Sequence, residues 1–106
     1  MGVTLIGASG ATYRFEGPFD NLDDLAEAAG VYAVLCMRAG KIDLVDVRES
    51  ARVRTGVENN DRSECWKQHC LGILKYAVYY EDGAGKQSGT NVMNDIIANY
   101  YLICGG

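Results

Sequence analysis

The sequence predicts an α/β (α+β) fold: a small, largely antiparallel sheet flanked by helices. Short runs rich in β-branched and aromatic residues are separated by glycine-containing turns, which is typical of strands joined as hairpins. Two later stretches have apolar residues at helical spacing. With 106 residues the chain is long enough for one hydrophobic core, so residues 1–106 are expected to form a single domain.

The first third of the chain predicts a hairpin followed by a helix. Residues 4–6 and 12–15 are strand-like and flank the loop Gly7-Ala8-Ser9-Gly10. Residues 21–29 then have the composition of a short helix, with acidic residues in the first turn and Asn21 as its N-cap.

The middle of the chain predicts a second hairpin and a helix. Residues 31–36 are almost all apolar, as in a buried central strand, and residues 42–47 alternate as a partner strand would. The loop 38–41 joins them. Ser50 is expected to cap a helix over residues 51–59.

The last third predicts a helical turn at 65–70, a strand at 73–80 and a mobile loop at 82–89. Thr90 is expected to cap a final helix that reaches Tyr101. Periodicity places one set of side chains in a common core: Val34, Val53, Val57, Tyr76, Val78, Ile96 and Ile97.

Charge argues against a nucleic-acid-binding protein. Ten basic and fourteen acidic residues give a net charge of −4, whereas affinity for nucleic acid comes largely from Lys and Arg. Most of the basic residues lie between 38 and 62, and this is the segment that could attract phosphates. Because the chain as a whole is acidic, nucleic-acid binding is expected to be weak at best. No apolar run approaches the length of a membrane span and no secretion signal is visible, so a cytoplasmic protein without a membrane partner is expected.

The four cysteines are expected to be reduced and free of metal, because cytosolic disulfides are rare. They are Cys36, Cys65, Cys70 and Cys104. The alternative is a zinc site made by Cys65, His69 and Cys70 with distant Cys104. Cys70 is rotated by about 100° from His69 at helical spacing, and no Cys-x-x-Cys pair exists, which disfavours zinc.

Several motifs together resemble one known family. Gly30-Val31-Tyr32 matches its first motif, and the run from Val47-Arg48-Glu49-Ser50 to Asp61-Arg62 is similar to its second motif and following helix. Glu64-Cys65-Trp66, the tyrosine-rich strand 76–80 and Cys104-Gly105 continue the likeness. The chain thus resembles the GIY-YIG nuclease superfamily, in particular a bacterial GIY-YIG-like subfamily, over most of its length.

The departures from the family pattern fall on its chemical groups. Asp46 and Arg48 occupy the positions of the second Tyr and the second Gly. Gly56 stands where the family has a helical Arg, and Asn60 stands where it has a His. The last helix lacks the metal-binding Glu, and Asp95 is the nearest acid.

These departures predict a catalytically inactive or very weak domain that acts as a binding module for a protein partner or for itself. Phosphodiester cleavage needs a base, a positively charged group that stabilises the developing charge of the phosphate, and a metal. Neither Asn60 nor Gly56 supplies any of these. No cofactor is then expected. The alternative is a metal-dependent DNA endonuclease with a rearranged site. It would use Tyr32, Arg52 or Arg54, and a Mg²⁺ ion on Asp95. A zinc-stabilised structural domain is the third possibility.

Overall fold

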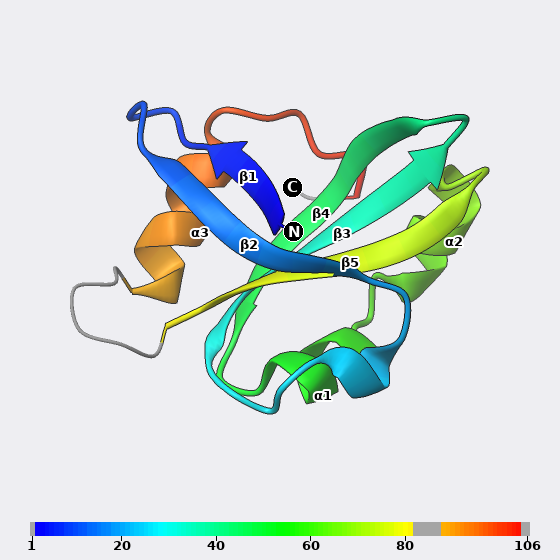
Figure 1. The fold of residues 1–106 in the computed structure, drawn as a ribbon, viewed down its shortest axis with the longest axis horizontal. Helices are drawn as coiled ribbons and strands as arrows, with labels where there is room; N and C mark the ends of the chain where they lie inside the picture. The colour runs from blue at the N-terminus through cyan, green and yellow to red at the C-terminus, as the bar shows by residue number, and fades with distance from the viewer. Residues whose placement is uncertain (1, 82–87, 105–106) are drawn as a thin grey trace.

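The computed structural model describes residues 2–81 and 88–104, and its fold has the predicted class (Figure 1). These residues form one five-stranded antiparallel sheet, three α-helices and a short 3₁₀ helix. The strands are β1 (Gly2–Ile6), β2 (Thr12–Phe19), β3 (Gly30–Arg38), β4 (Lys41–Ser50) and β5 (Ile73–Tyr80). The helices are α1 (Val53–Glu58), α2 (Ser63–His69) and α3 (Gly89–Ile97).

Both predicted hairpins are present, and the strand order in the sheet is β1-β2-β5-β3-β4. The β3–β4 turn consists of Ala39 and Gly40, both with positive φ (51° and 79°). This is the geometry of a two-residue type I′ turn, whose twist matches that of the strands it joins. The last strand in sequence, β5, lies between the two hairpins and joins them into one sheet.

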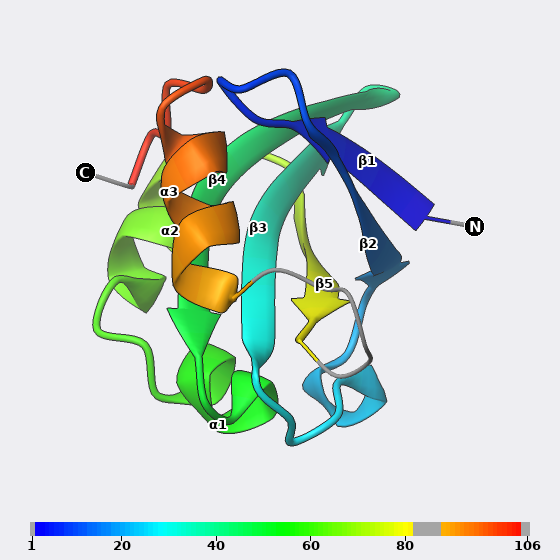
Figure 2. The ribbon, with the colours of Figure 1, turned by 90° about the vertical axis from the view of Figure 1, so that its left-hand side faces the viewer.

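The sheet carries a separate hydrophobic core on each face, so the prediction of one shared core is wrong. Residues Val34, Val53, Val57, Tyr76 and Val78 do pack together, under α1 and α2. Ile96 belongs to the opposite core, where α3 packs against β3 and β4 (Figure 2). Ile97 is 37% exposed. The alternating side chains of β3 enter both cores, which explains its nearly continuous apolar sequence.

The predicted helix at 21–29 is only a 3₁₀ turn at Leu22–Asp24, and Asn21 makes no side-chain cap. Tertiary contacts replace the expected helix. Leu25 is fully buried, and the Arg54 guanidinium donates hydrogen bonds to the carbonyl oxygens of Leu25 and Asp23. These contacts hold the segment around the 3₁₀ turn against α1.

Two further caps differ from the predicted ones. Ser50 ends β4, and its hydroxyl bonds to the backbone of Arg52, so α1 begins only at Val53. Ser88, rather than Thr90, caps α3 by accepting from the Asn91 amide. Helix α3 ends at Ile97, short of the predicted Tyr101. Most of the loop predicted at 82–89 lies outside the described residues.

The prediction of reduced cysteines is wrong. Cys36 is bonded to Cys70 and Cys65 to Cys104, with Cα–Cα distances of 5.6 and 5.9 Å. The first disulfide joins β3 to the residue that ends α2, and the second joins α2 to the C-terminal segment. These bonds also occupy the thiols that the zinc alternative required. Among the helices described, none has the length and apolar character to cross a membrane.

We expect the two disulfides to supply a large part of the stability. They close loops with sequence separations of 34 and 39 residues, and loops of this length correspond to about 3–4 kcal/mol each in the chain-entropy treatment. Urea unfolding with and without a thiol reductant measures the difference. Titration of the unfolded, non-reduced chain should find no free thiol. Four titratable thiols, or identical unfolding curves, would contradict the pairing.

Candidate functional site

Tyr32, Gly56 and Asn60 lie close together where α1 approaches the sheet. The Asn60 amide donates a hydrogen bond of 2.5 Å to the Tyr32 hydroxyl. At Gly56, a Cβ atom would lie 2.9 Å from the Ser50 Cβ and 3.5 Å from the Tyr32 ring. A larger residue at position 56 would therefore displace Ser50, which explains the glycine in the middle of a helix. The structure thus places these three residues side by side.

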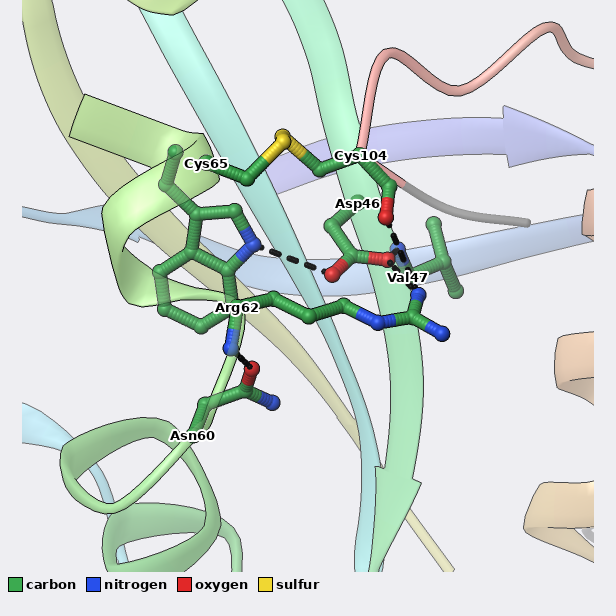
Figure 3. The surroundings of a disulfide bond; sticks show 7 residues. Asp46, Val47, Asn60, Arg62, Cys65 and Cys104 are labelled. Atoms are coloured by element: carbon green, nitrogen blue, oxygen red, sulfur yellow. Dashed lines mark hydrogen bonds and ion pairs between the residues drawn. A yellow bond between two sulfur atoms is a disulfide. The ribbon is translucent and has the colours of Figure 1, made fainter. Parts of the chain in front are cut away.

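Asp46, which occupies the second Tyr position, lies in the same region and is completely buried (Figure 3). The Trp66 indole N–H donates to Asp46 Oδ2 at 3.0 Å, and the Val47 amide donates to Oδ1 at 2.9 Å. The Arg62 guanidinium is 3.6 Å from Oδ1. A buried carboxylate is stable only with such donors and a compensating cation around it.

Arg62 connects this carboxylate to the rest of the site. Its backbone N–H donates to Asn60 Oδ1 at 2.7 Å, and its guanidinium donates to the Cys104 carbonyl at 3.0 Å (Figure 3). We call the following residues the Asp46 cluster: Tyr32, Asp46, Asn60, Arg62 and Trp66. In the described part of the chain, no buried side-chain nitrogen or oxygen lacks a hydrogen-bond partner.

The Asp46 cluster has little capacity for acid–base chemistry. Burial is the main cause that raises the pKa of the Tyr32 phenol above its ordinary 10.0, and the donation from Asn60 only partly opposes this. The phenol is therefore protonated at neutral pH and is a poor base. The cations that act on it are Arg48 and Arg62. Sequence reasoning assigned no role to Arg62 or Trp66, although both lie in the motif run that suggested the family.

Arg52 and Arg54, the predicted catalytic cations, are engaged elsewhere. Arg54 holds the carbonyls of Asp23 and Leu25, as described above. Arg52 lies 3.4 Å from the carboxylate of Glu27 at an exposed position. Glu27 also accepts from the Thr55 amide at 2.7 Å, and its bonds with Thr55 are the main cause that lowers its pKa. Both arginines thus attach the segment before β3 to α1.

Asp95, the predicted metal ligand, lies on the opposite face of the sheet from the Asp46 cluster. It accepts hydrogen bonds from the Ser9 amide (2.9 Å), the Ser9 hydroxyl (2.6 Å) and the Tyr13 hydroxyl (2.6 Å). Gly7 permits this approach, because a Cβ at that position would overlap the carboxylate. Asp95 therefore fastens α3 to the β1–β2 turn. No group of three or more candidate metal ligands occurs in the described residues.

A mainly apolar hollow is lined by residues that belong to neither of these two sites. It is a groove of about 520 Å³ between the edge strands β1 and β4 and the segment after α3. We call it the β1–β4 groove. Its walls include Val3–Leu5 of β1, Ile42–Leu44 of β4, and Tyr100, Tyr101 and Ile103. Ile42 is 49% exposed and Tyr101 is 92% exposed.

Comparison with known proteins adds no assignment. No family model matches the chain. No curated protein and no solved structure matches it significantly. The resemblance to GIY-YIG nucleases therefore stays a prediction from the motifs.

The Arg62–Asp46 pair is expected to contribute far more stability than the exposed Arg52–Glu27 pair. Arg62→Met should lower the free energy of unfolding by about 2–3 kcal/mol, because a buried carboxylate loses its cation while two other donors remain. Arg52→Met is the matched control and should cost less than about 1 kcal/mol. Urea unfolding of both variants measures this. Equal losses would show that Asp46 does not depend on Arg62.

Asp95 should make stability depend on pH in the acid range. The hydrogen bond from the Ser9 side chain is the main cause that lowers its pKa below 3.8, followed by that from Tyr13. A lowered folded pKa gives stabilisation that is present above the unfolded value and is lost as pH falls through the folded value. Wild type should thus be more stable than Asp95→Asn at pH 7. The difference between their free energies of unfolding should disappear as the pH falls below about 4. Asp61→Asn is the exposed control. A gap that is constant from pH 7 to pH 2 would contradict this.

Proposed function

We propose that this chain is a catalytically inactive GIY-YIG-like domain that binds a protein partner through the β1–β4 groove. The observation that carries the first half is the Asp46 cluster, whose polar groups bond to one another. The observation that carries the second half is the exposed apolar lining of the groove. The two features have no residue in common.

The alternative of a DNA endonuclease lacks supporting geometry. Asn60 cannot take a proton and Tyr32 holds its own. The Asp46 carboxylate is fully buried and accepts from Trp66 and Val47, so the cluster offers a substrate no accessible general base. The charge of Arg62 is offset by Asp46 at 3.6 Å. A metal held at Asp95 would lie across the sheet from Tyr32. Groups on opposite faces of a sheet cannot act together on one phosphate, since catalysis requires them within hydrogen-bond reach.

A protein partner fits the groove better than nucleic acid does. Rimmed apolar hollows on a protein surface mark contacts with proteins or apolar ligands. Asp43 is the charged residue among those that line the groove, and the chain carries a net charge of −4. Both features oppose a phosphate backbone. Self-association through the same surface is the second form of this proposal.

The disulfide-bonded cysteines bear on the cellular compartment in which the domain acts. Disulfides persist in oxidising environments and are rare in the cytosol. The cytoplasmic location stays a prediction from the sequence, and the two disulfides count against it. We propose that the domain acts where thiols are oxidised.

Selection of displayed peptides tests the groove. Ten-residue random peptides are presented to the oxidised protein in two formats, one flanked on both sides and one with a free C-terminus. We expect apolar sequences to be enriched in at least one format. Their affinity should fall at least about tenfold on Ile42→Glu, because a buried charge would enter the contact.

The control is Leu71→Glu, which changes an equally apolar, highly exposed residue outside the groove and should leave affinity unchanged. Absence of enrichment in both formats, or peptides indifferent to Ile42→Glu, would reject the groove as the binding site. Nicking of plasmid DNA in Mg²⁺ by wild type that disappears in Asp95→Ala would reject the inactive assignment.

A further inference from the structure

The edge of β1 presents free backbone groups to the β1–β4 groove. The backbone groups of Ile6 point away from β2. Its N–H donates to the Tyr100 hydroxyl at 3.0 Å, and its carbonyl accepts from the Asn99 side chain at 2.8 Å. Backbone direction alternates along an antiparallel strand, so Thr4, two residues earlier, also points its N–H and carbonyl away from β2. Within residues 2–81 and 88–104, no bond outside the sheet ladder engages these two groups.

The edge of β4 does the same on the other side. The two-residue turn makes Arg38 and Lys41 the closing pair, which exchanges hydrogen bonds within the hairpin. Ile42 therefore points its N–H and carbonyl away from β3, towards the groove. Three consecutive residues of β4, Ile42–Leu44, line the groove, so both faces of the strand contribute to it at this edge.

The two edges run in the same direction. Each neighbouring pair in the order β1-β2-β5-β3-β4 is antiparallel, so the direction alternates and β1 and β4 are alike. A segment that lies antiparallel to one edge is then antiparallel to both. An extended strand has backbone donors and acceptors on both of its sides for two such edges, whereas a helix uses its backbone groups internally. Three residues on each wall span about 10 Å, the length of three to four residues of a bound strand.

The direction also fixes which end of that strand meets the β3–β4 turn. A strand antiparallel to β4 ends where β4 begins, next to Lys41. A hollow of about 300 Å³ lies at this end, lined by Arg38, Ala39, Lys41 and Asp43, and Asp43 also lines the groove. In the described structure neither Arg38 nor Lys41 forms an ion pair. Asp43 offsets one of their two charges, which leaves a single positive charge at this end.

We propose that the β1–β4 groove binds the free C-terminal segment of a partner protein as an extended strand between β1 and β4. Its terminal carboxylate lies at Arg38 and Lys41, and its apolar side chains contact Ile42, Leu44 and Tyr101. The charge at the turn matches one carboxylate, and the open edges match one strand. This inference rests on the proposed function, because it specifies the partner of the same groove.

The test uses a peptide enriched in the selection described above, synthesised with a C-terminal carboxylate and with a C-terminal amide. Wild type should bind the acid at least about tenfold more tightly than the amide, since charge-assisted hydrogen bonds to a carboxylate are the stronger ones. The double change Arg38→Gln, Lys41→Gln should abolish this preference and leave amide binding unchanged. Lys67→Gln, which removes a positive charge outside the groove, is the control and should retain the preference.

Equal affinity for acid and amide, or a preference that survives Arg38→Gln, Lys41→Gln, would overturn the inference and leave the groove as a binding site. So would enrichment confined to peptides flanked on both sides. Thermal unfolding and circular dichroism of the double variant guard against a folding defect. If no peptide is enriched in either format, the proposed function fails first and this inference fails with it.

Discussion

The burial of one carboxylate constrains much of this structure. Asp46 has no exposed surface, and a charge in that position is tolerated only with donors and a cation close by. One donor is the Val47 amide of its own strand, and the other is Trp66 in α2. The cation is Arg62, the residue that directly precedes α2 in the sequence. To satisfy Asp46, the chain must place α2 and the turn before it against β4. Arg62 then reaches the Cys104 carbonyl and positions the C-terminal segment as well.

The same interactions determine which part of the β4 edge remains open. The Val47 amide is taken by Asp46 Oδ1, and the Val45 carbonyl accepts from the Cys104 amide at 3.0 Å. Both would otherwise be unpaired groups on an edge strand, which is a common template for unwanted pairing. The cluster thus closes the middle of the edge. Ile42–Leu44 are left open, and they are the residues that line the groove.

The sequence predicted local structure well and tertiary partners poorly. β3, β4 and β5 were predictable because β-branched and aromatic runs between glycine turns carry their signal locally. The short helix at 21–29 was not, because this segment is held by contacts with Arg54, which lies far along the chain. Tyr32, Gly56 and Asn60 lie together in the structure, whereas Asp95 lies on the opposite face of the sheet. Helical periodicity does not reveal which face of a sheet a helix covers. The cysteine pairs, 34 and 39 residues apart, have no local signal at all.

A groove with a rigid wall binds at lower entropic cost than one that must be ordered on binding. The wall formed by Tyr100–Ile103 is fixed at both ends. At one end the Tyr100 hydroxyl accepts from Ile6, and at the other Cys104 is held by Cys65, Val45 and Arg62. Leu102, buried between them, anchors the centre. The Asp46 cluster and the groove are therefore parts of one arrangement. The residues of the cluster bond to one another and, through Arg62 and Cys104, hold the wall of the surface that we propose for binding.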